Sequence, residues 1–393
     1  MTEALQAPRE GVPDVITTDA QLRAYAARCS GTGPVAIDAE RASGFKYSQR
    51  AYLIQTRTAE AGTALIDPIT ATDFSELAQS FADREWILHA ASQDLACLAD
   101  VGLVPQRIFD TELAGRLLGR ERVGLAPIVE SELGLVLSKG HGAADWSTRP
   151  LPDAWLNYAA LDVEVLIELR DVLAAALDAS GKREWAEQEF EHVRVNLAAP
   201  PVRTDPWRRT SGIHKVRKLR NLAVVRALWT ERDRIAAQRD ISPGRVLPDA
   251  AIIAAATAMP STLSELSVVP GFTGRGQQRR IATWWAAVDR ARGLPESKLP
   301  APNPPGDGPP APRNWPDRNP AAFGRLEAAK AKLAALSEQV QVPVENLMQP
   351  DLVRRMCWEP PVDLDSTLAA GGARPWQIDL VGPVLRAAFV TGE

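Results

Sequence analysis

The chain has 393 residues, of which 45% are hydrophobic and 24% charged, a composition typical of a globular protein with two or three domains. The chain has three widely spaced cysteines, no apolar run long enough for a membrane span and no secretory signal. These features exclude a disulfide partner, a zinc knuckle and a membrane protein. They predict a cytoplasmic location. The net charge of −4 argues against nucleic-acid binding, yet the segment from Arg203 to Arg239 is strongly basic.

The first 200 residues have the pattern of a mixed α/β domain. Short runs rich in Ile, Leu and Val, bounded by turn residues, predict buried strands at Pro34–Ala39, Ala51–Thr56, Ala64–Asp67 and Trp86–His89. Later apolar residues recur at three- and four-residue spacing and predict helices at Asp94–Asp100, Thr111–Leu118, Leu125–Leu133 and Asp153–Leu177. Adjacent strands followed by alternating strands and helices indicate a mixed sheet covered by helices.

The rest of the chain is predicted to be helical and divided by two proline-rich connectors. Ala198–Pro206 is read as a linker before a helical domain at residues 207–295. A second linker at residues 296–314 includes Pro300–Pro312, and a C-terminal helical domain at residues 315–393 follows it. Within that last domain, helices are expected near 321–340 and 381–388.

Asp38 and Glu40 stand two residues apart at the end of the first predicted strand. Because side chains alternate along a strand, both carboxylates leave the same face. Adjacent carboxylates repel each other unless a positive charge lies between them, and oxygen ligands favour Mg²⁺ or Mn²⁺. An acidic strand end on the surface is the simpler interpretation when this pair is considered alone.

Two further acidic positions favour a metal site over an acidic strand end on the surface. Tyr158 and Asp162 are four apart in a helical pattern and so share one helical face, although an ordinary half-buried aromatic and a solvated acid would give the same pattern. Asp94 follows a predicted buried strand at the start of a helix, where an aspartate commonly caps free backbone N–H groups. Taken together, four acids and a tyrosine occur in the order D-x-E, D, Y-x-x-x-D.

This order and its surroundings resemble the ribonuclease D family of 3′–5′ exonucleases, in the tyrosine-bearing branch of the DEDD superfamily. The resemblance covers residues 16–177. Its motifs are Val35–Arg41 (VAIDAER), His89–Leu95 (HAASQDL) with Phe109–Leu113 (FDTEL), and Ala144–Leu151 (ADWSTRPL) leading into Tyr158–Asp162.

The resemblance implies a ribonuclease H-like fold and two divalent ions, Mg²⁺ or Mn²⁺. It implies that Asp38, Glu40, Asp94 and Asp162 are the metal ligands and that Tyr158 orients the attacking water. Two such ions can activate a water and stabilise a leaving 3′-oxygen, which agrees with a chain that has only four histidines. The expected products are 5′-mononucleotides.

Residues 207–294 resemble an HRDC domain, on the basis of Trp207–Ile213 (WRRTSGI), Leu222–Arg239, Asp240–Leu247 and Met259–Leu266 (MPSTLSEL). Basic side chains there, including Lys215, Arg217 and Lys218, are candidate phosphate contacts, and a solvated cationic face is the alternative. The domain at 315–393 is expected to resemble a second HRDC-like module.

A few residues of the first domain are also candidates for substrate contact. His89 and Arg50 are weighed as nucleic-acid-binding residues, with strand-end packing as the alternative for His89. Phe45 and Tyr47 are expected either to stack on bases or to pack internally. His141 is expected to be a solvated loop residue, with contact to the nucleic acid as the alternative.

Three functions follow from these patterns. The first is a two-metal 3′–5′ exoribonuclease acting on a nucleic acid with a free 3′ end, in the processing of tRNA precursors or in RNA turnover. The second is a 3′–5′ DNA exonuclease in repair, because no motif reports on the sugar. The third, a non-catalytic nucleic-acid-binding scaffold, predicts lost acids and is disfavoured because all four are present.

Overall fold

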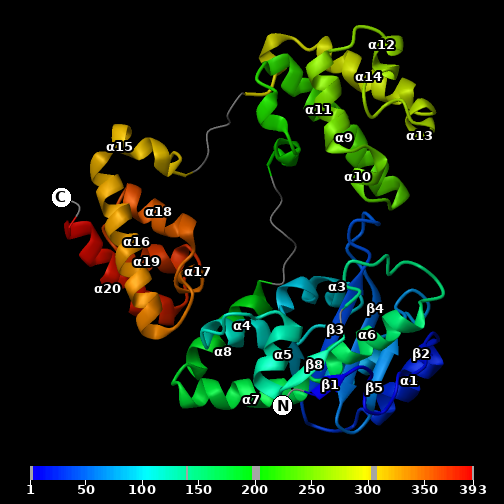
Figure 1. The fold of residues 1–393 in the computed structure, drawn as a ribbon, viewed down its shortest axis with the longest axis vertical. Coiled ribbons are helices and arrows are strands. Elements are labelled where there is room, and N and C mark those ends of the chain that lie inside the picture. Colours follow the sequence, from blue (N-terminus) through cyan, green and yellow to red (C-terminus); the bar gives the residue numbers. More distant parts are fainter. Residues whose placement is uncertain (1–2, 139, 197–203, 302–307, 392–393) are drawn as a thin grey trace.

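The computed structural model describes residues 3–138, 140–196, 204–301 and 308–391, so most of the predicted linker at Ala198–Pro206 and the middle of Pro300–Pro312 lie outside the described residues. An N-terminal α/β domain is followed by two all-helical parts, the central part (204–301) and the C-terminal part (308–391) (Figure 1). This agrees with the fold class expected from the sequence. None of the described helices is both long and apolar enough to cross a membrane.

The N-terminal domain is built on a six-stranded mixed sheet with the strand order β2-β5-β4-β3-β6-β7. The central strand β3 is antiparallel to β4 and parallel to β6. A separate two-stranded sheet pairs β1 with β8. The strands are β1 (Glu3–Leu5), β2 (Val15–Ile16), β3 (Val35–Arg41), β4 (Ala51–Thr58), β5 (Gly62–Ile66), β6 (Glu85–Leu88), β7 (Arg107–Asp110) and β8 (Leu135–Leu137).

Helices cover both faces of this sheet, because its central strands are apolar on both sides. Helix α6 packs on β3, β4 and β5, while on the opposite face the Tyr25 hydroxyl of α1 lies 2.9 Å from Oγ1 of Thr56 in β4. The helices are α1 (Asp19–Arg28), α2 (Ser75–Phe81), α3 (Leu95–Ala99), α4 (Thr111–Leu117), α5 (Leu125–Leu133), α6 (Asp153–Glu164), α7 (Leu166–Ala179) and α8 (Arg183–Val195).

The central part has its own apolar core, in which the buried residues come mainly from α9, α11 and α14. Figure 1 shows α10 at the end of the long helix α9 that faces the N-terminal domain. The helices are α9 (Leu219–Arg239), α10 (Pro243–Val246), α11 (Asp249–Ala258), α12 (Leu263–Ser267), α13 (Arg275–Gln278) and α14 (Ile281–Arg292).

The central part contacts the N-terminal domain through the segment that follows β3. The carboxylate of Asp240 accepts hydrogen bonds from the backbone N–H of Ser48, at 2.8 Å, and from the hydroxyl of Tyr52, at 3.3 Å. The Arg245 guanidinium lies 4.2 Å from the ring centroid of Phe45. The hydroxyl of Tyr47 donates to Asp233. Phe45 and Tyr47 therefore make contacts between domains, which is the packing alternative of the two expectations for them.

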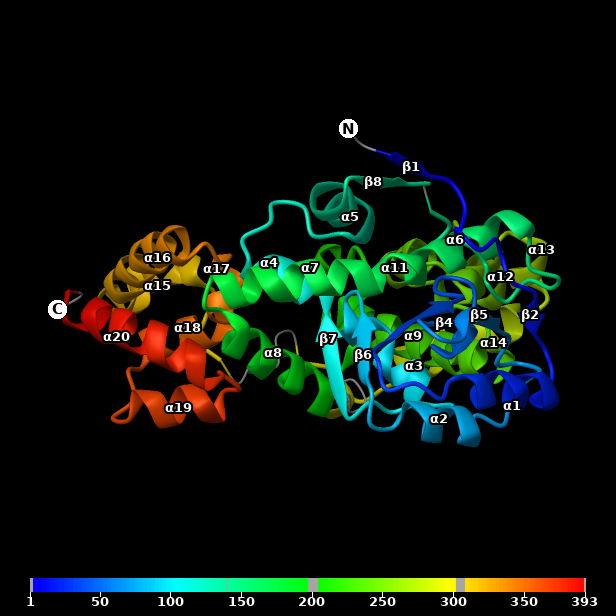
Figure 2. The ribbon, with the colours of Figure 1, turned by 90° about the horizontal axis from the view of Figure 1, so that it is seen from below.

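The C-terminal part contacts the N-terminal domain at α8, and buried apolar residues form one continuous cluster across the two (Figure 2). Trp376 stacks on Trp185 of α8 with ring centroids 5.0 Å apart. The helices are α15 (Trp315–Arg318), α16 (Pro320–Val340), α17 (Val344–Leu347), α18 (Pro350–Trp358), α19 (Leu364–Ala370) and α20 (Pro375–Thr391).

Several elements of the N-terminal domain differ from the sequence-based prediction, which did not include β1, β2, β8, α1, α2 or α8. The single helix predicted over Asp153–Leu177 is two helices, since α6 ends at Glu164 and α7 begins at Leu166. The break falls at Val165, where neither glycine nor proline marks it. Strand β7 was not predicted, because its four residues begin and end with charged side chains and give no clear period.

Candidate active site

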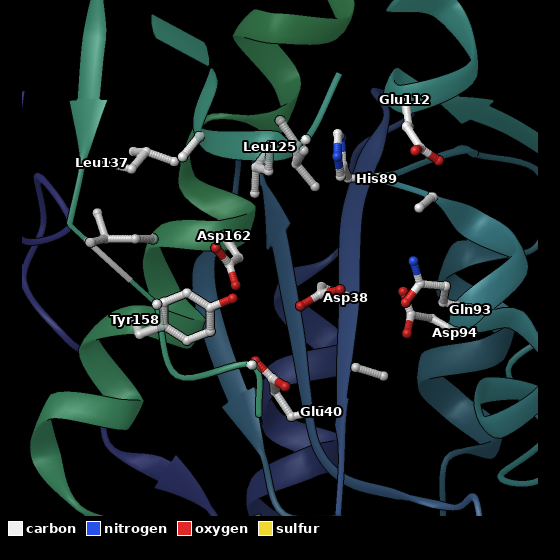
Figure 3. A pocket seen from close by; sticks show the side chains of 18 of the residues that line it. Asp38, Glu40, His89, Gln93, Asp94, Glu112, Leu125, Leu137, Tyr158 and Asp162 are labelled. Atoms are coloured by element: carbon white, nitrogen blue, oxygen red, sulfur yellow. The ribbon is translucent and has the colours of Figure 1, made fainter. Parts of the chain in front are cut away.

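The acidic residues of the first and third motifs meet in one pocket beside the sheet (Figure 3). Asp38 and Glu40 leave the same face of β3, and α6 crosses that face and brings Asp162 to them. One carboxylate oxygen from each of these three residues lies within 4.8 Å of the others. Asp38 and Glu40 share a face of the strand, as expected from their spacing. They form a site with Asp162 only because α6 packs across that face.

Asp94 lines the same pocket from the opposite side, just before α3. Burial raises the pKa of its carboxyl group, which lies close enough to that of Asp38 for the charge of Asp38 to raise this pKa further. Asp94 does not serve as a side-chain cap for α3, so the capping alternative considered for it is wrong. The four acids thus face one cavity, three of them within mutual reach of a single ion and the fourth close to Asp38.

The turn that carries Asp94 is held by Asp110, a buried residue at the N-terminus of α4. One oxygen of Asp110 accepts from the backbone N–H of Ala90 at 3.1 Å and the other from that of Ala91 at 2.8 Å. Asp110 also caps α4 by accepting from Glu112 and Leu113. Ala90 has φ of 60°, a left-handed conformation that costs energy for a residue with a side chain. Asp110 therefore stabilises the strained turn that places Asp94.

Tyr158 enters the pocket from α6, one helical turn before Asp162, so the two side chains lie on the same face of the helix. Its ring lies among aromatic neighbours, with centroids 6.0 Å from His141 and 6.5 Å from Trp146. His141 also packs against Trp155 at 6.1 Å. His141 is therefore half-buried and not a fully solvated loop residue, because the loop before α6 folds back onto the tyrosine.

Gly140 lies directly against the ring of Tyr158 and leaves no room for a side chain. A Cβ atom at residue 140 would stand 2.3 Å from Cε2 of Tyr158, whereas one at Gly142 would stand 3.6 Å from its hydroxyl oxygen. We expect Gly140→Ala to displace the ring and to lower kcat by about 10²-fold, the order expected for a misplacement of about 1 Å. Single-turnover rates would measure this, with Gly142→Ala as the matched control. Equal rates for the two variants would contradict it.

Burial and mutual repulsion dominate the electrostatics of the pocket. Burial raises the pKa of Asp38, Asp94 and Asp162, and burial together with the charge of Asp38 raises the pKa of Glu40. Burial lowers the pKa of His89 to about 4, so this imidazole is neutral near pH 7. Its Nδ1 lies 2.9 Å from Oγ1 of Thr111. The charge of Arg41, which also lines the pocket, lowers the pKa of Asp38, Glu40 and Asp94 but does not offset the effect of burial, and the neutral His89 adds no positive charge.

The other predicted nucleic-acid contacts lie in different places. His89 lines the pocket. Arg50 is exposed on the segment after β3 and lies over the ring of Tyr52, with 5.0 Å to its centroid. Lys215, Arg217 and Lys218 are exposed at the N-terminal end of α9. The opposite end of that helix, about 31 Å away for 21 residues, contacts the N-terminal domain. The structure does not bring these three cations to the acidic pocket.

The pocket has further lining residues that were not singled out from the sequence, including Arg41, Gln93, Glu112 and Gly140. Gln93 and Arg41 are each one residue from a predicted ligand, so proximity to a motif was the available signal. Nothing in the sequence indicated that Gly140 touches Tyr158, because the contact depends on how the loop returns to α6.

Three family models match successive parts of the chain. The model described as 3′-5′ exonuclease matches residues 13–178, the HRDC domain matches 221–288, and the model described as 3′ to 5′ exonuclease C-terminal domain matches 308–389. The order of the first two agrees with the resemblance drawn from the motifs.

Similar proteins include two bacterial ones named ribonuclease D. The protein from Escherichia coli K12 is 32% identical over 292 residues, covering 73% of this chain and 77% of that one. The protein from Granulibacter bethesdensis is 30% identical over 380 residues, covering 94% and 91%.

Two solved structures resemble the whole chain. A protein from Bifidobacterium adolescentis matches with a TM-score of 0.92 and 36% identity over 99% of this chain and 100% of that one. The E. coli RNase D structure, described as an exoribonuclease involved in structured RNA processing, matches with a TM-score of 0.72 and 27% identity, over 95% of this chain and 98% of that one.

Proposed function

The chain belongs to the ribonuclease D family, and on that premise we propose that it removes nucleotides one at a time from the free 3′ end of RNA and releases 5′-mononucleotides. It is a 3′–5′ exoribonuclease by family and by domain composition. The observation that supports the proposed chemistry best is the convergence of Asp38, Glu40 and Asp162 from β3 and α6, with Asp94 lining the same pocket.

The acidic cluster suits divalent metal ions by the nature of its donors. Asp38, Glu40, Asp94 and Asp162 offer only carboxylate oxygens, which are the ligands preferred by hard cations such as Mg²⁺ and Mn²⁺. The pKa values of all four are raised by burial, so the cluster binds positive charge strongly, either as protons or as metal. We assign these four side chains as the metal ligands.

Bound ions would lower the pKa of an attacking water and stabilise the charge on the leaving 3′-oxygen. The remaining side chains act by position. Burial raises the pKa of Tyr158 above that of a free phenol, so its hydroxyl stays protonated and orients the water through a hydrogen bond without acting as a strong base. His89, neutral because burial lowers its pKa to about 4, provides no positive charge near neutral pH.

A labelled single strand tests this activity directly. The purified full chain with Mg²⁺ or Mn²⁺ is expected to shorten a 5′-labelled RNA in single-nucleotide steps, because its acids cannot bind phosphate without a cation between them. EDTA should stop the reaction, and a 3′-phosphorylated strand should resist if a free 3′ end is required. Internal cleavage products, or a ladder that persists in EDTA, would refute the mechanism.

The natural substrate is proposed to be a structured RNA such as a tRNA precursor with a single-stranded 3′ extension. The support is that the E. coli structure carries the description of an exoribonuclease involved in structured RNA processing. The exposed cations Lys215, Arg217 and Lys218 would then contact upstream phosphates with salt-dependent affinity. A matched DNA strand in the same assay separates this proposal from a DNA exonuclease, which would degrade the DNA strand faster than the RNA strand.

A further inference from the structure

Gln55 in β4 is fully buried, and neither its amide nitrogen nor its amide oxygen has a hydrogen-bond partner among the described residues. A buried amide without partners destabilises a fold, and an apolar residue of similar size would avoid that cost. The neighbouring residues of the strand, Leu53 and Ile54, are apolar and fully buried. A polar residue at this position therefore needs an explanation outside the packing of the sheet.

The strand register places Gln55 beside the acidic cluster. Gln55 stands directly opposite Asp38 in the antiparallel pair of β4 and β3. Opposed residues of such a pair point to the same face, with Cβ atoms about 5 Å apart, within reach of a long side chain. That face is covered by α6, which carries Asp162. Gln55 thus lies in the layer between the sheet and α6, immediately behind Asp38.

The other polar side chain on this face of β4 is already engaged. Arg57 lies 3.2 Å from the Glu164 carboxylate and donates to Oγ1 of Thr63 at 2.9 Å. Carboxylates that bind a metal are usually held by hydrogen bonds to their free oxygen, and these outer partners fix the orientation of the ligand. Among the described residues of β4, Gln55 is the one that combines a free donor with a place beside Asp38.

We infer that Gln55 is a positioning residue: its Nε2–H, which has no partner among the described residues, turns to donate to the Asp38 carboxylate when a cation binds the acidic cluster, and so fixes that carboxylate as a ligand. The inference rests on the proposed function, since it requires a cation at the acidic cluster. Gln55 does not touch the substrate. Its effect is expected on the affinity for the metal, and loss of such an outer partner typically weakens metal binding 10- to 100-fold.

The test compares Gln55→Met with Gln377→Met, both of which remove a buried amide and keep its bulk. Gln377 lies far along the chain in α20, where its Nε2 donates to the Asn346 carbonyl at 2.7 Å and its Oε1 accepts from the Arg374 N–H at 3.0 Å. Mn²⁺ binding to the full chain without RNA is measured by calorimetry, and unfolding is measured in EDTA. Gln55→Met should bind Mn²⁺ at least about 10-fold more weakly without loss of metal-free stability. Gln377→Met should lose stability and keep its affinity.

The outcomes distinguish a failure of the role proposed for Gln55 from a failure of the proposed function. Wild-type affinity in Gln55→Met, with Mn²⁺ still bound by the wild type, overturns the role of Gln55 alone. Absence of Mn²⁺ binding in the wild type overturns the metal site and with it the proposed function. A crystal structure of the Mn²⁺-loaded wild type decides the matter if Gln55→Met does not fold. A distance well above about 3.5 Å between Gln55 Nε2 and both Asp38 oxygens would then refute the hydrogen bond.

Discussion

Replacing Asp38 with alanine is expected to reduce kcat for RNA by at least about 10³-fold while the protein stays folded. Asp38 lies between Asp94 on one side of the pocket and Glu40 and Asp162 on the other (Figure 3), so its loss removes the central ligand of the proposed metal site. A loss of about 4 kcal/mol of transition-state stabilisation corresponds to a factor of about 10³.

The same change should not weaken the metal-free fold. Burial raises the pKa of Asp38, and the charge of Asp38 contributes to the raised pKa of Glu40 and Asp162. The Asp38 carboxylate therefore destabilises the metal-free folded state. Single-turnover kinetics and urea unfolding in EDTA measure the two effects. Glu187→Ala, which removes an exposed acid on α8, is the control and should change neither quantity. Turnover at the wild-type rate in Asp38→Ala would overturn the assignment of the site.

Replacing Glu189 with alanine is expected to lower the free energy of unfolding by about 3–5 kcal/mol, the range for removing one partner of a buried ion pair. Glu189 of α8 accepts two hydrogen bonds from the Arg374 guanidinium, at 2.6 and 2.7 Å, and one from the indole N–H of Trp376 at 2.8 Å. These contacts join the N-terminal domain to the C-terminal part. Without Glu189 the arginine is left buried and unpaired, and the junction between the two parts loosens.

The matched control for this prediction is on the same helix. Glu191 pairs with Arg194 three residues on, but its side chain is 56% exposed, so Glu191→Ala should cost no more than about 0.5 kcal/mol. Urea unfolding measures both variants, and hydrogen exchange in α20 reports on the junction. Equal, small losses of unfolding free energy in the two variants would mean that the contacts of Glu189 with Arg374 and Trp376 do not stabilise the protein.

The N-terminal domain was largely predictable from local patterns. The predicted strands around Asp38 and Ala51–Thr56 correspond to β3 and β4, because central strands of a covered sheet are apolar on both faces and give a strong signal. The helix break at Val165 and the strand β7 were missed. Neither is marked by glycine, proline or a clear period, so both are set by packing against the rest of the domain.

The sequence by itself identified Asp38, Glu40 and Asp162 as candidate metal ligands, because their motifs resemble those of the family and their spacings match the periods of a strand and a helix. Only the tertiary structure decided that Asp94 faces the pocket beside Asp38 instead of capping its helix, and that Gln55 lies behind the Asp38 carboxylate. The reason is physical: a local pattern fixes the direction in which a side chain leaves its own element. Which group it meets depends on strand register and helix packing between segments far apart in the chain.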